Sequence, residues 1–400
     1  MVGYRIDLTE PRPKIDRKAQ DDVAEIMYNS FEIMRASVSV HDGIIPWIRS
    51  IADPDAVRAN EHELLQWEEG KRPTLKQIAE MSKQLMVPFG YFLLTQPVAF
   101  EQDSPAFRTL GSRLKHDMSP NLRDTVGKME AIQDWLRDEA EEVELDRCPI
   151  AAILNGQSVM EAASLLRKAL HLDVDWYRSV SSDKAYDHIR SIAGKCQVFI
   201  FESGIVSDNT HRVLSLDEFR GFALYDSIVP LIFINSRDNV RAKAFTLLHE
   251  LVHIAKGSDD LMRGVDEESF CNRVAAEIMV PEAELREFWA AQNLISKASS
   301  LDAVASRFRC SKSVAVHRTY SLGLISSDVR DEVLSTISNA IAKRKAGGNY
   351  YNTKAARLDH NFLNMLRASL QEGRTRYTDA FRLTGCWGSK YDKLMAQVTE

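Results

Sequence analysis

The sequence lacks the marks of a membrane or secreted protein. Its apolar stretches, such as residues 228–234, are far shorter than the roughly 20 residues of a membrane-spanning helix. Its first residues contain no continuous apolar segment of the kind found in signal peptides. The five cysteines are odd in number and show no CxxC spacing, which argues against a disulfide framework or a cysteine zinc finger. We therefore expect a cytoplasmic protein.

The chain also lacks the positive charge of a protein that coats nucleic acid. Its 400 residues carry 51 basic and 57 acidic side chains, a formal net charge of −6, so any contact with DNA or RNA would need a local basic patch. Residues 341–393 form such a patch, with eleven basic and four acidic residues. Lys343, Arg344 and Lys345 lie at its beginning and are candidate contacts.

Two interpretations of this basic segment stay open. It could be a solvated helical appendage with a small apolar core of Phe362, Leu363, Leu366 and Leu370. Alternatively, it could contact DNA or RNA without sequence specificity, because basic side chains neutralise phosphates and aromatic ones stack on bases. The aromatic residues concerned are Tyr350, Tyr351, Phe362, Tyr377, Phe381, Trp387 and Tyr391.

The spacing of apolar residues predicts a mostly helical fold with one small sheet. The composition, 44% hydrophobic and 27% charged, does not fit wholesale disorder. Apolar residues at spacings of three and four predict helices over most of the chain. Short runs rich in aromatic and β-branched residues predict three strands, at residues 197–202, 221–225 and 229–234. We expect an α+β, predominantly helical protein built from an N-terminal helical domain (1–97), a helical connector (98–184), a core (185–290), a helix-turn-helix-like segment (291–335) and a basic helical C-terminal segment (336–400).

The clearest chemical signal is the HExxH motif His249-Glu250-Leu251-Val252-His253. It lies in a predicted helix that is capped by Asp238 and ends at Gly257. Residues i and i+4 share one helix face, so His249 and His253 can bind one Zn²⁺ at roughly 2.0–2.1 Å. Glu250 is offset by about 100° and could act as a general base on a metal-bound water. The motif has apolar flanks on both sides, which a solvated helix face would not have.

A zinc peptidase needs a third protein ligand, and three glutamates of the next predicted helix compete for that role. Glu268 is favoured, because Asn272 lies four residues later on the same face and could support a ligand histidine by a hydrogen bond. Glu267 points about 100° away from Glu268 and is expected to be solvated. Glu277 lies in a later turn and is expected to be an exposed helix charge.

Other candidate residues carry weaker signals. His211 and Tyr225 lie near the predicted strands and could polarise a scissile carbonyl, although ordinary surface or sheet positions explain them as well. Residues 301–325 have a helix-turn-helix pattern in which Lys312 and Arg318 could face a DNA major groove. Packing of this segment against the core is the alternative that we favour. Cys271 is expected to pack as a small hydrophobic residue.

Residues 185–285 closely resemble the ImmA/IrrE family of zinc metallopeptidases. The resemblance rests on the strand pair in GFALYDSIVPLIFINS, the helix FTLLHELVHI and the later helix ESFCNRVAAEIMVP. It implies a zincin-like core in which His249, His253 and Glu268 hold Zn²⁺ and Glu250 is the base. The N-terminal domain resembles an XRE-type helix-turn-helix domain in Trp67–Gly70, Pro73-Thr74 and Pro88–Leu93, with Thr74 as the expected cap of a helix. Its segment before the recognition helix departs from that type, so DNA binding competes with a structural or protein-docking role.

The resemblance implies an endopeptidase with a single regulatory protein as its substrate. That substrate would be an XRE-type repressor encoded nearby, and its cleavage would derepress stress, mobile-element or defence genes. We expect the substrate to pair as an extended strand with residues 221–225. The alternative is a non-catalytic DNA- or protein-binding regulator, similar to an antitoxin, with a structural or vestigial metal site. The intact motif favours the enzyme, because a structural site has no need of Glu250.

Overall fold

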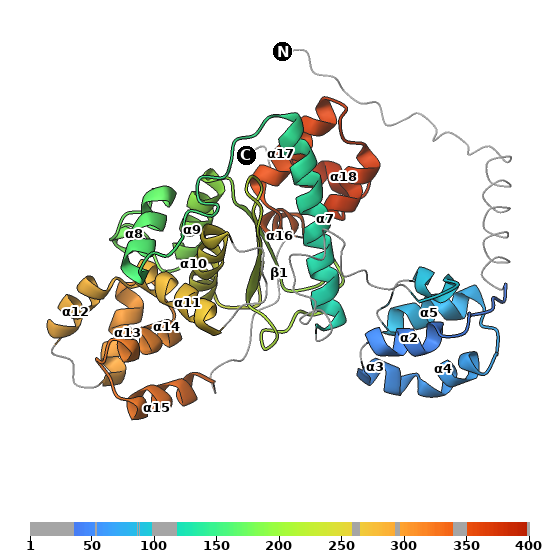
Figure 1. Cartoon of the computed structure of the whole chain (residues 1–400), viewed down its shortest axis with the longest axis horizontal. Coiled ribbons are helices and arrows are strands. Elements are labelled where there is room, and N and C mark those ends of the chain that lie inside the picture. Colours follow the sequence, from blue (N-terminus) through green and yellow to red (C-terminus); the bar gives the residue numbers. More distant parts are fainter. Residues whose placement is uncertain are drawn as a thin grey trace, which may run out of the picture. The chain divides into compact units, whose positions relative to one another are not determined.

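The computed structural model in Figure 1 describes residues 36–97 except Asp53, Met86 and Pro88, together with residues 118–257, 265–292, 297–338 and 350–397. The chain divides into two compact units, residues 1–101 and 102–400.

The first unit is a small bundle of short helices. Its elements are α2 (Ile44–Ile51), α3 (Pro54–Ala59), α4 (Glu61–Glu68), α5 (Leu75–Leu85) and the 3-10 helix η1 (Phe89–Leu93). Ile48, Leu64 and Ile78 are fully buried between them, and the ring of Trp67 packs edge-on against Phe92 at 5.9 Å. Thr74 caps α5 as expected: its Oγ1 accepts the Gln77 N–H at 3.2 Å, while Gln77 Oε1 accepts the Thr74 N–H at 2.9 Å. The predicted helical bundle is confirmed in this range.

The second unit contains a three-stranded sheet of β1 (Phe199–Ser203), β2 (Gly221–Leu224) and β3 (Leu231–Asn235). The strand order is β1-β3-β2, with β1 parallel and β2 antiparallel to β3. The three strands that the sequence predicts are thus present, each shifted by at most two residues. The central strand β3 is buried along its whole length, so both faces of the sheet must be covered.

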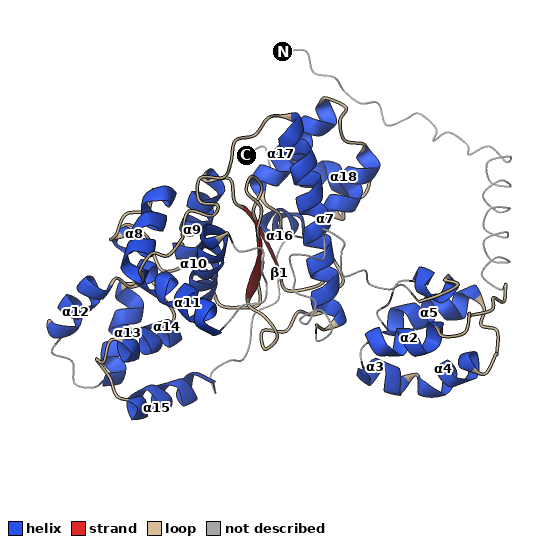
Figure 2. Ribbon diagram, in the orientation of Figure 1, coloured by secondary structure: helices blue, strands red, loops and turns tan. Residues whose placement is uncertain are grey.

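Helices cover both faces of the sheet, as Figure 2 shows. Because strand side chains alternate between faces, Ile200 and Ile232 point to the layer of α8 (Val159–Leu170), α9 (Ala185–Lys195), α10 (Val240–Lys256) and α11 (Val265–Met279). Phe201 and Phe233 point to the opposite layer. That layer consists of α7 (Pro120–Glu142), α16 (Tyr350–Arg357), α17 (His360–Gln371), α18 (Tyr377–Thr384) and α19 (Ser389–Ala396).

Segments that are far apart in the sequence build the second layer together. The Trp135 ring of α7 packs edge-on against Phe362 of α17 at 5.6 Å. The Ser369 hydroxyl donates a hydrogen bond to the buried carboxylate of Glu139 at 2.6 Å. Of the expected apolar core, Phe362, Leu363 and Leu366 are fully buried and Leu370 is partly buried. The C-terminal helices therefore complete the sheet domain instead of forming a separate core.

The remaining helices extend the first layer. They are the 3-10 helix η3 (Trp176–Arg178), α12 (Glu282–Ala290), α13 (Lys297–Arg307), α14 (Lys312–Ser321) and α15 (Ser327–Ser338). The turn between α13 and α14 places Phe308 and Cys310 in the same core as α10, so this predicted helix-turn-helix pattern packs against the core as we favoured. The fold is α+β and mostly helical, as predicted. Among the residues that the structure describes, no helix combines the length and apolar character needed to cross a bilayer.

Candidate metal centre

Helix α10 carries the HExxH motif through the interior of the second unit. It begins at Asn239, whose Oδ1 accepts the Ala242 N–H at 2.9 Å. The cap is thus Asn239 and not Asp238, because the buried Asp238 carboxylate is engaged by Arg220. Helix α10 ends at Gly257, as expected, where the backbone angle φ is 65°. A Cβ there would lie 2.2 Å from Ala152 Cβ, so only glycine allows this close approach.

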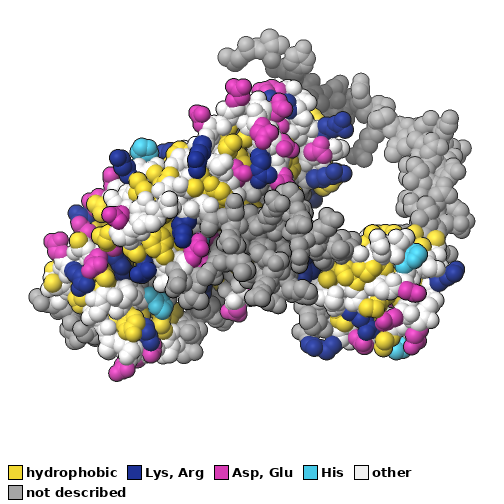
Figure 3. Space-filling view, viewed as in Figure 1, with side chains coloured by type: hydrophobic (Ala, Val, Ile, Leu, Met, Phe, Trp, Pro, Cys, Tyr) yellow, Lys and Arg dark blue, Asp and Glu magenta, His cyan; other side chains and the backbone are white. Residues whose placement is uncertain are grey.

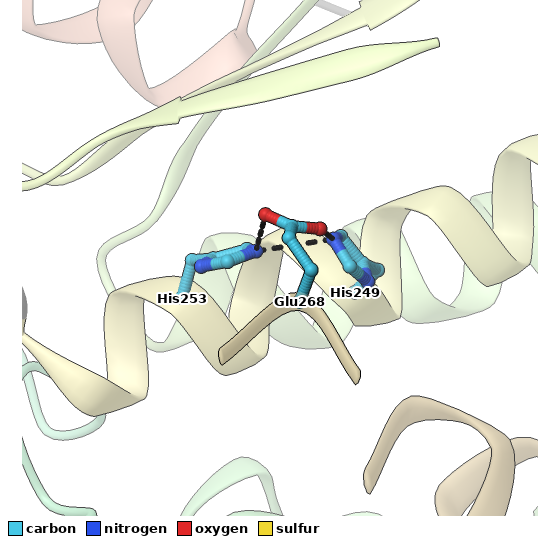
Figure 4. A group of neighbouring side chains, drawn as sticks. All are labelled: His249, His253 and Glu268. Carbon is cyan, nitrogen blue, oxygen red and sulfur yellow. Dashed lines mark hydrogen bonds and ion pairs between the residues drawn. The ribbon is translucent and has the colours of Figure 1, made fainter. Parts of the chain in front are cut away.

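The two histidines of the motif converge on one point, as the spacing predicts. His249 Nε2 and His253 Nε2 lie 3.0 Å apart, and the rings are tilted by 69°. Their side chains are only 12% and 7% exposed. Figure 4 shows Glu268 reaching between the two imidazoles from a different helix, α11.

Glu268 completes a set of three ligand atoms. Its Oε2 lies 3.3 Å from His249 Nε2 and its Oε1 lies 3.4 Å from His253 Nε2. Ligands held roughly 2.0–2.1 Å from Zn²⁺ at tetrahedral angles are about 3.3 Å apart, close to the separations observed here. Two nitrogens and a carboxylate also suit Zn²⁺ chemically. The three residues therefore fit a zinc ion, and they leave a fourth position for another ligand.

Glu250 is buried, with 2% of its surface exposed. It follows His249 directly on α10 and so leaves the helix about 100° away from the ligand face. Because of this offset, the Glu250 carboxylate does not belong to the group of three ligand atoms, although its residue is the direct neighbour of His249 in the helix. A carboxylate in this position can act on a proton near the metal centre.

The support of His253 differs from the prediction. Asn272 is exposed, so its predicted hydrogen bond to a ligand histidine is not found in the described structure. Cys271 instead places its Sγ 3.6 Å from His253 Nδ1. Glu267, expected to be solvated, is only 19% exposed and lies 4.0 Å from the same nitrogen. The difference arises because α11 packs with its Cys271 side, not its Asn272 side, against α10.

Glu267 also forms an ion pair that the sequence does not reveal. Its Oε1 lies 3.5 Å from Lys256 Nζ, in the last turn of α10. Acidic groups beside the second nitrogen of a ligand histidine fix the orientation of the ring. Glu267 and Cys271 therefore lie beside Nδ1 of His253, the ring nitrogen that does not face Glu268. The spacing of residues in the sequence predicts this role for neither of them.

Glu277 and Arg318 are paired in the interior. Glu277 is expected to be exposed, and this prediction is wrong; for Arg318, the burial agrees with the favoured packing and not with the alternative of a DNA contact. Their side chains are only 3% and 7% exposed and form a direct ion pair. Arg167 of α8 lies 3.9 Å from the same carboxylate, and Arg318 Nε donates to the Val280 carbonyl at 3.1 Å. The end of α11 is covered by α8 and α14, so these groups bind one another and not solvent.

The other candidate residues lie outside this cluster. Tyr225 is half-buried just after β2, and a Cβ at Gly257 would lie 3.4 Å from its ring. His211 is exposed in the loop between β1 and β2. Lys312 pairs with Asp302 at 2.8 Å. The candidates Lys343, Arg344 and Lys345 lie outside the described residues.

Comparisons with protein families agree with the geometry. Residues 208–320, which contain all three candidate ligands, match the IrrE N-terminal-like domain, so this part of the chain is similar to the metallopeptidase-like ImmA/IrrE family. Residues 358–397 match a domain of unknown function, DUF8813. No curated protein is similar enough to the chain to count as a relative. The matched segments do not include the first unit, for which the XRE-type resemblance stays a prediction.

Proposed function

We propose that the chain is a zinc-dependent endopeptidase. The observation that carries this proposal is the convergence of His249, His253 and Glu268, whose ligand atoms lie 3.0 to 3.4 Å apart. The buried Glu250 beside them supports catalysis over a purely structural site, because a structural zinc site is closed by its ligands and has no use for a base. The IrrE N-terminal-like match supports the same conclusion.

The chemistry divides between the metal and Glu250. Zinc held by the three ligands would acidify a water molecule and polarise the scissile carbonyl. Glu250 would accept the proton from that water and deliver a proton to the leaving amine. Because Glu250 is buried, bulk solvent would not compete for the proton that it carries, and the proton would pass to the leaving amine of the substrate.

The edge strand β2 supports binding of the substrate as an extended strand. In the described part of the chain, β2 pairs with β3 alone, so its other edge can accept a further strand. β2 also lies very close to α10, since a Cβ at Gly221 would be 2.8 Å from Thr246 Cγ2. Thr246 is one turn before His249. A peptide paired with β2 would thus run beside the motif helix.

We propose an XRE-type repressor as the substrate. The test is to co-express the wild-type chain with a candidate helix-turn-helix repressor, chosen from the genes that neighbour its own, and to search for repressor fragments by mass spectrometry. We expect two fragments that share one cleavage site, and an intact repressor when the growth medium contains a zinc chelator. An intact repressor under both conditions, still bound to the chain, would instead support the non-catalytic regulator.

We also propose that the chain contacts nucleic acid, through a surface of its C-terminal helices that carries exposed aromatic rings. Phe362 and Tyr391 are buried, whereas Tyr377 and Trp387 are 62% and 59% exposed. Both exposed rings pack on Phe381, at 6.1 and 5.4 Å. The exposed basic residues nearest to them in sequence are Arg376, Arg382 and Lys390. In Figure 3, basic and acidic side chains alternate on the face in view, so such contact would be local.

Replacing both exposed rings, in Tyr377→Ala/Trp387→Ala, should weaken binding of single-stranded oligonucleotides. Stacking contributes about 1–3 kcal/mol per base, so we expect a loss of roughly fivefold or more for each ring. Fluorescence anisotropy at low salt measures this, with Tyr320→Ala as a control because Tyr320 is also exposed but lies on α14. Unchanged affinity in the double variant, or no binding by the wild type, would contradict the proposal.

A further inference from the structure

A small cavity lies on the face of the sheet opposite the motif helix. It has a volume of about 40 Å³ and lies between α7, the end of β1 with its following loop, and α16. Phe201 and Phe233, which line it, belong to the core of the second layer. The cavity is therefore separated from the candidate metal centre by the sheet itself.

Three basic side chains line this cavity. Lys354, only 3% exposed, holds both carboxylate oxygens of Asp208 at 2.8 and 2.9 Å. Arg357 approaches the same carboxylate at 3.9 Å. Lys128 projects from α7 into the same place. The carboxylate of Asp208 thus forms ion pairs with both Lys354 and Arg357.

Asp208 itself is not part of the lining, and the two carboxylates that do line the cavity are bound by cations of their own. Asp124 lies 2.7 Å from Arg212. Glu202 lies 2.8 Å from Lys243 of α10. Within the described residues, no carboxylate is within ion-pair distance of Lys128. The cavity therefore has an excess of positive charge, with three cations around Asp208.

Lys128 and Lys354 are close enough to act on one ligand. A Cβ placed on Gly385 would lie 3.7 Å from Lys128 Nζ and 3.3 Å from Lys354 Nζ, so the two nitrogens are at most about 7 Å apart. Gly385 ends α18 with φ of 73°, and its missing side chain leaves this space open. Burial and the nearby Lys354 together lower the pKa of Lys128 to about 8. A cation in such surroundings is stabilised by a bound anion.

We propose that this cavity is a binding site for one tetrahedral oxyanion, either free phosphate or the phosphoryl group of a small molecule. Lysine and arginine side chains together offer several charge-assisted donors, which match the oxygens of a phosphate. The volume has room for about three water molecules, so it fits the oxyanion and not a whole nucleotide. This site is independent of the proposed peptidase activity, and its ligand would connect α7, the loop after β1 and α16.

The test compares thermal unfolding of the full chain in sodium phosphate and in sodium chloride at equal ionic strength. We expect phosphate to raise the melting temperature in a saturable way, and titration calorimetry to give one site per chain. In Lys128→Met the phosphate affinity should fall roughly tenfold or more, as for the loss of a hydrogen bond to a charged group. In chloride the same variant should melt higher than the wild type, because a buried cation that lies beside the positive charge of Lys354 has been removed.

Lys168→Met is the matched control, since Lys168 is an exposed lysine of α8 far in sequence from the cavity lining. It should respond to phosphate as the wild type does. A response of equal size in Lys128→Met and the wild type would overturn the proposal and locate phosphate elsewhere, for example at the metal. The absence of a saturable response to both phosphate and AMP would overturn it as well. Binding of AMP but not phosphate would identify the ligand as a phosphoryl group carried by a larger molecule.

Discussion

Glu250→Gln is expected to abolish peptide cleavage while the protein keeps its fold and its zinc. Glutamine has nearly the shape of glutamate and fits the same buried position, but it cannot accept the proton of the attacking water. General acid–base groups contribute about 10²–10⁴-fold to the rate, so the initial rate should fall by that factor. The measurement is cleavage of the repressor by wild-type and variant proteins that have been adjusted to equal zinc content.

The control for this experiment is Glu282→Gln. Glu282 lies on α12, where its carboxylate pairs with Arg286 on the surface at 2.8 Å, so its replacement should leave the rate almost unchanged. Circular dichroism and thermal unfolding show whether either variant is folded. Turnover near the wild-type rate in Glu250→Gln would mean that another group is the base.

His253→Ala should lose most of the bound zinc, of which we expect about one ion per wild-type chain. Two of the three ligands remain in this variant, and two protein ligands rarely retain zinc, because structural sites use four and catalytic sites three. Elemental analysis of the purified proteins after dialysis against a weak chelator gives the zinc content. The buried position of His253 means that folding must be verified on the same samples.

His211→Ala is the matched control for the metal experiment. His211 is exposed in the loop after β1 and does not belong to the His249–His253–Glu268 cluster, so this variant should keep its zinc. An undiminished zinc content in His253→Ala would refute the ligand assignment. Loss of zinc in His211→Ala would show that this loop contributes a ligand.

The features of this chain that can be predicted from its residues alone are local ones. The HExxH spacing places His249 and His253 one turn apart on any α-helix. In the structure their Nε2 atoms lie 3.0 Å apart. Thr74 caps α5 and Gly257 ends α10, because capping depends on a few neighbouring residues. The three strands are also predicted from a few neighbouring residues, because each corresponds to a short run rich in aromatic and β-branched side chains. Glu268, the glutamate of α11 that the sequence favours as third ligand, lies beside both imidazoles, and its role as a ligand stays a prediction.

The way in which the helices face one another depends on tertiary packing and does not follow from the residue pattern. The periodicity of α11 shows which residues share a face, but not which face meets α10. Support of a ligand histidine, His249 or His253, is therefore predicted for Asn272, whereas the structure places Cys271 against His253. The burial of Glu277 depends on Arg318, which is 41 residues later in the chain. The cavity of Lys128, Asp208 and Lys354 combines three distant segments. Such contacts depend on how whole elements pack, and local spacing carries no information about that packing.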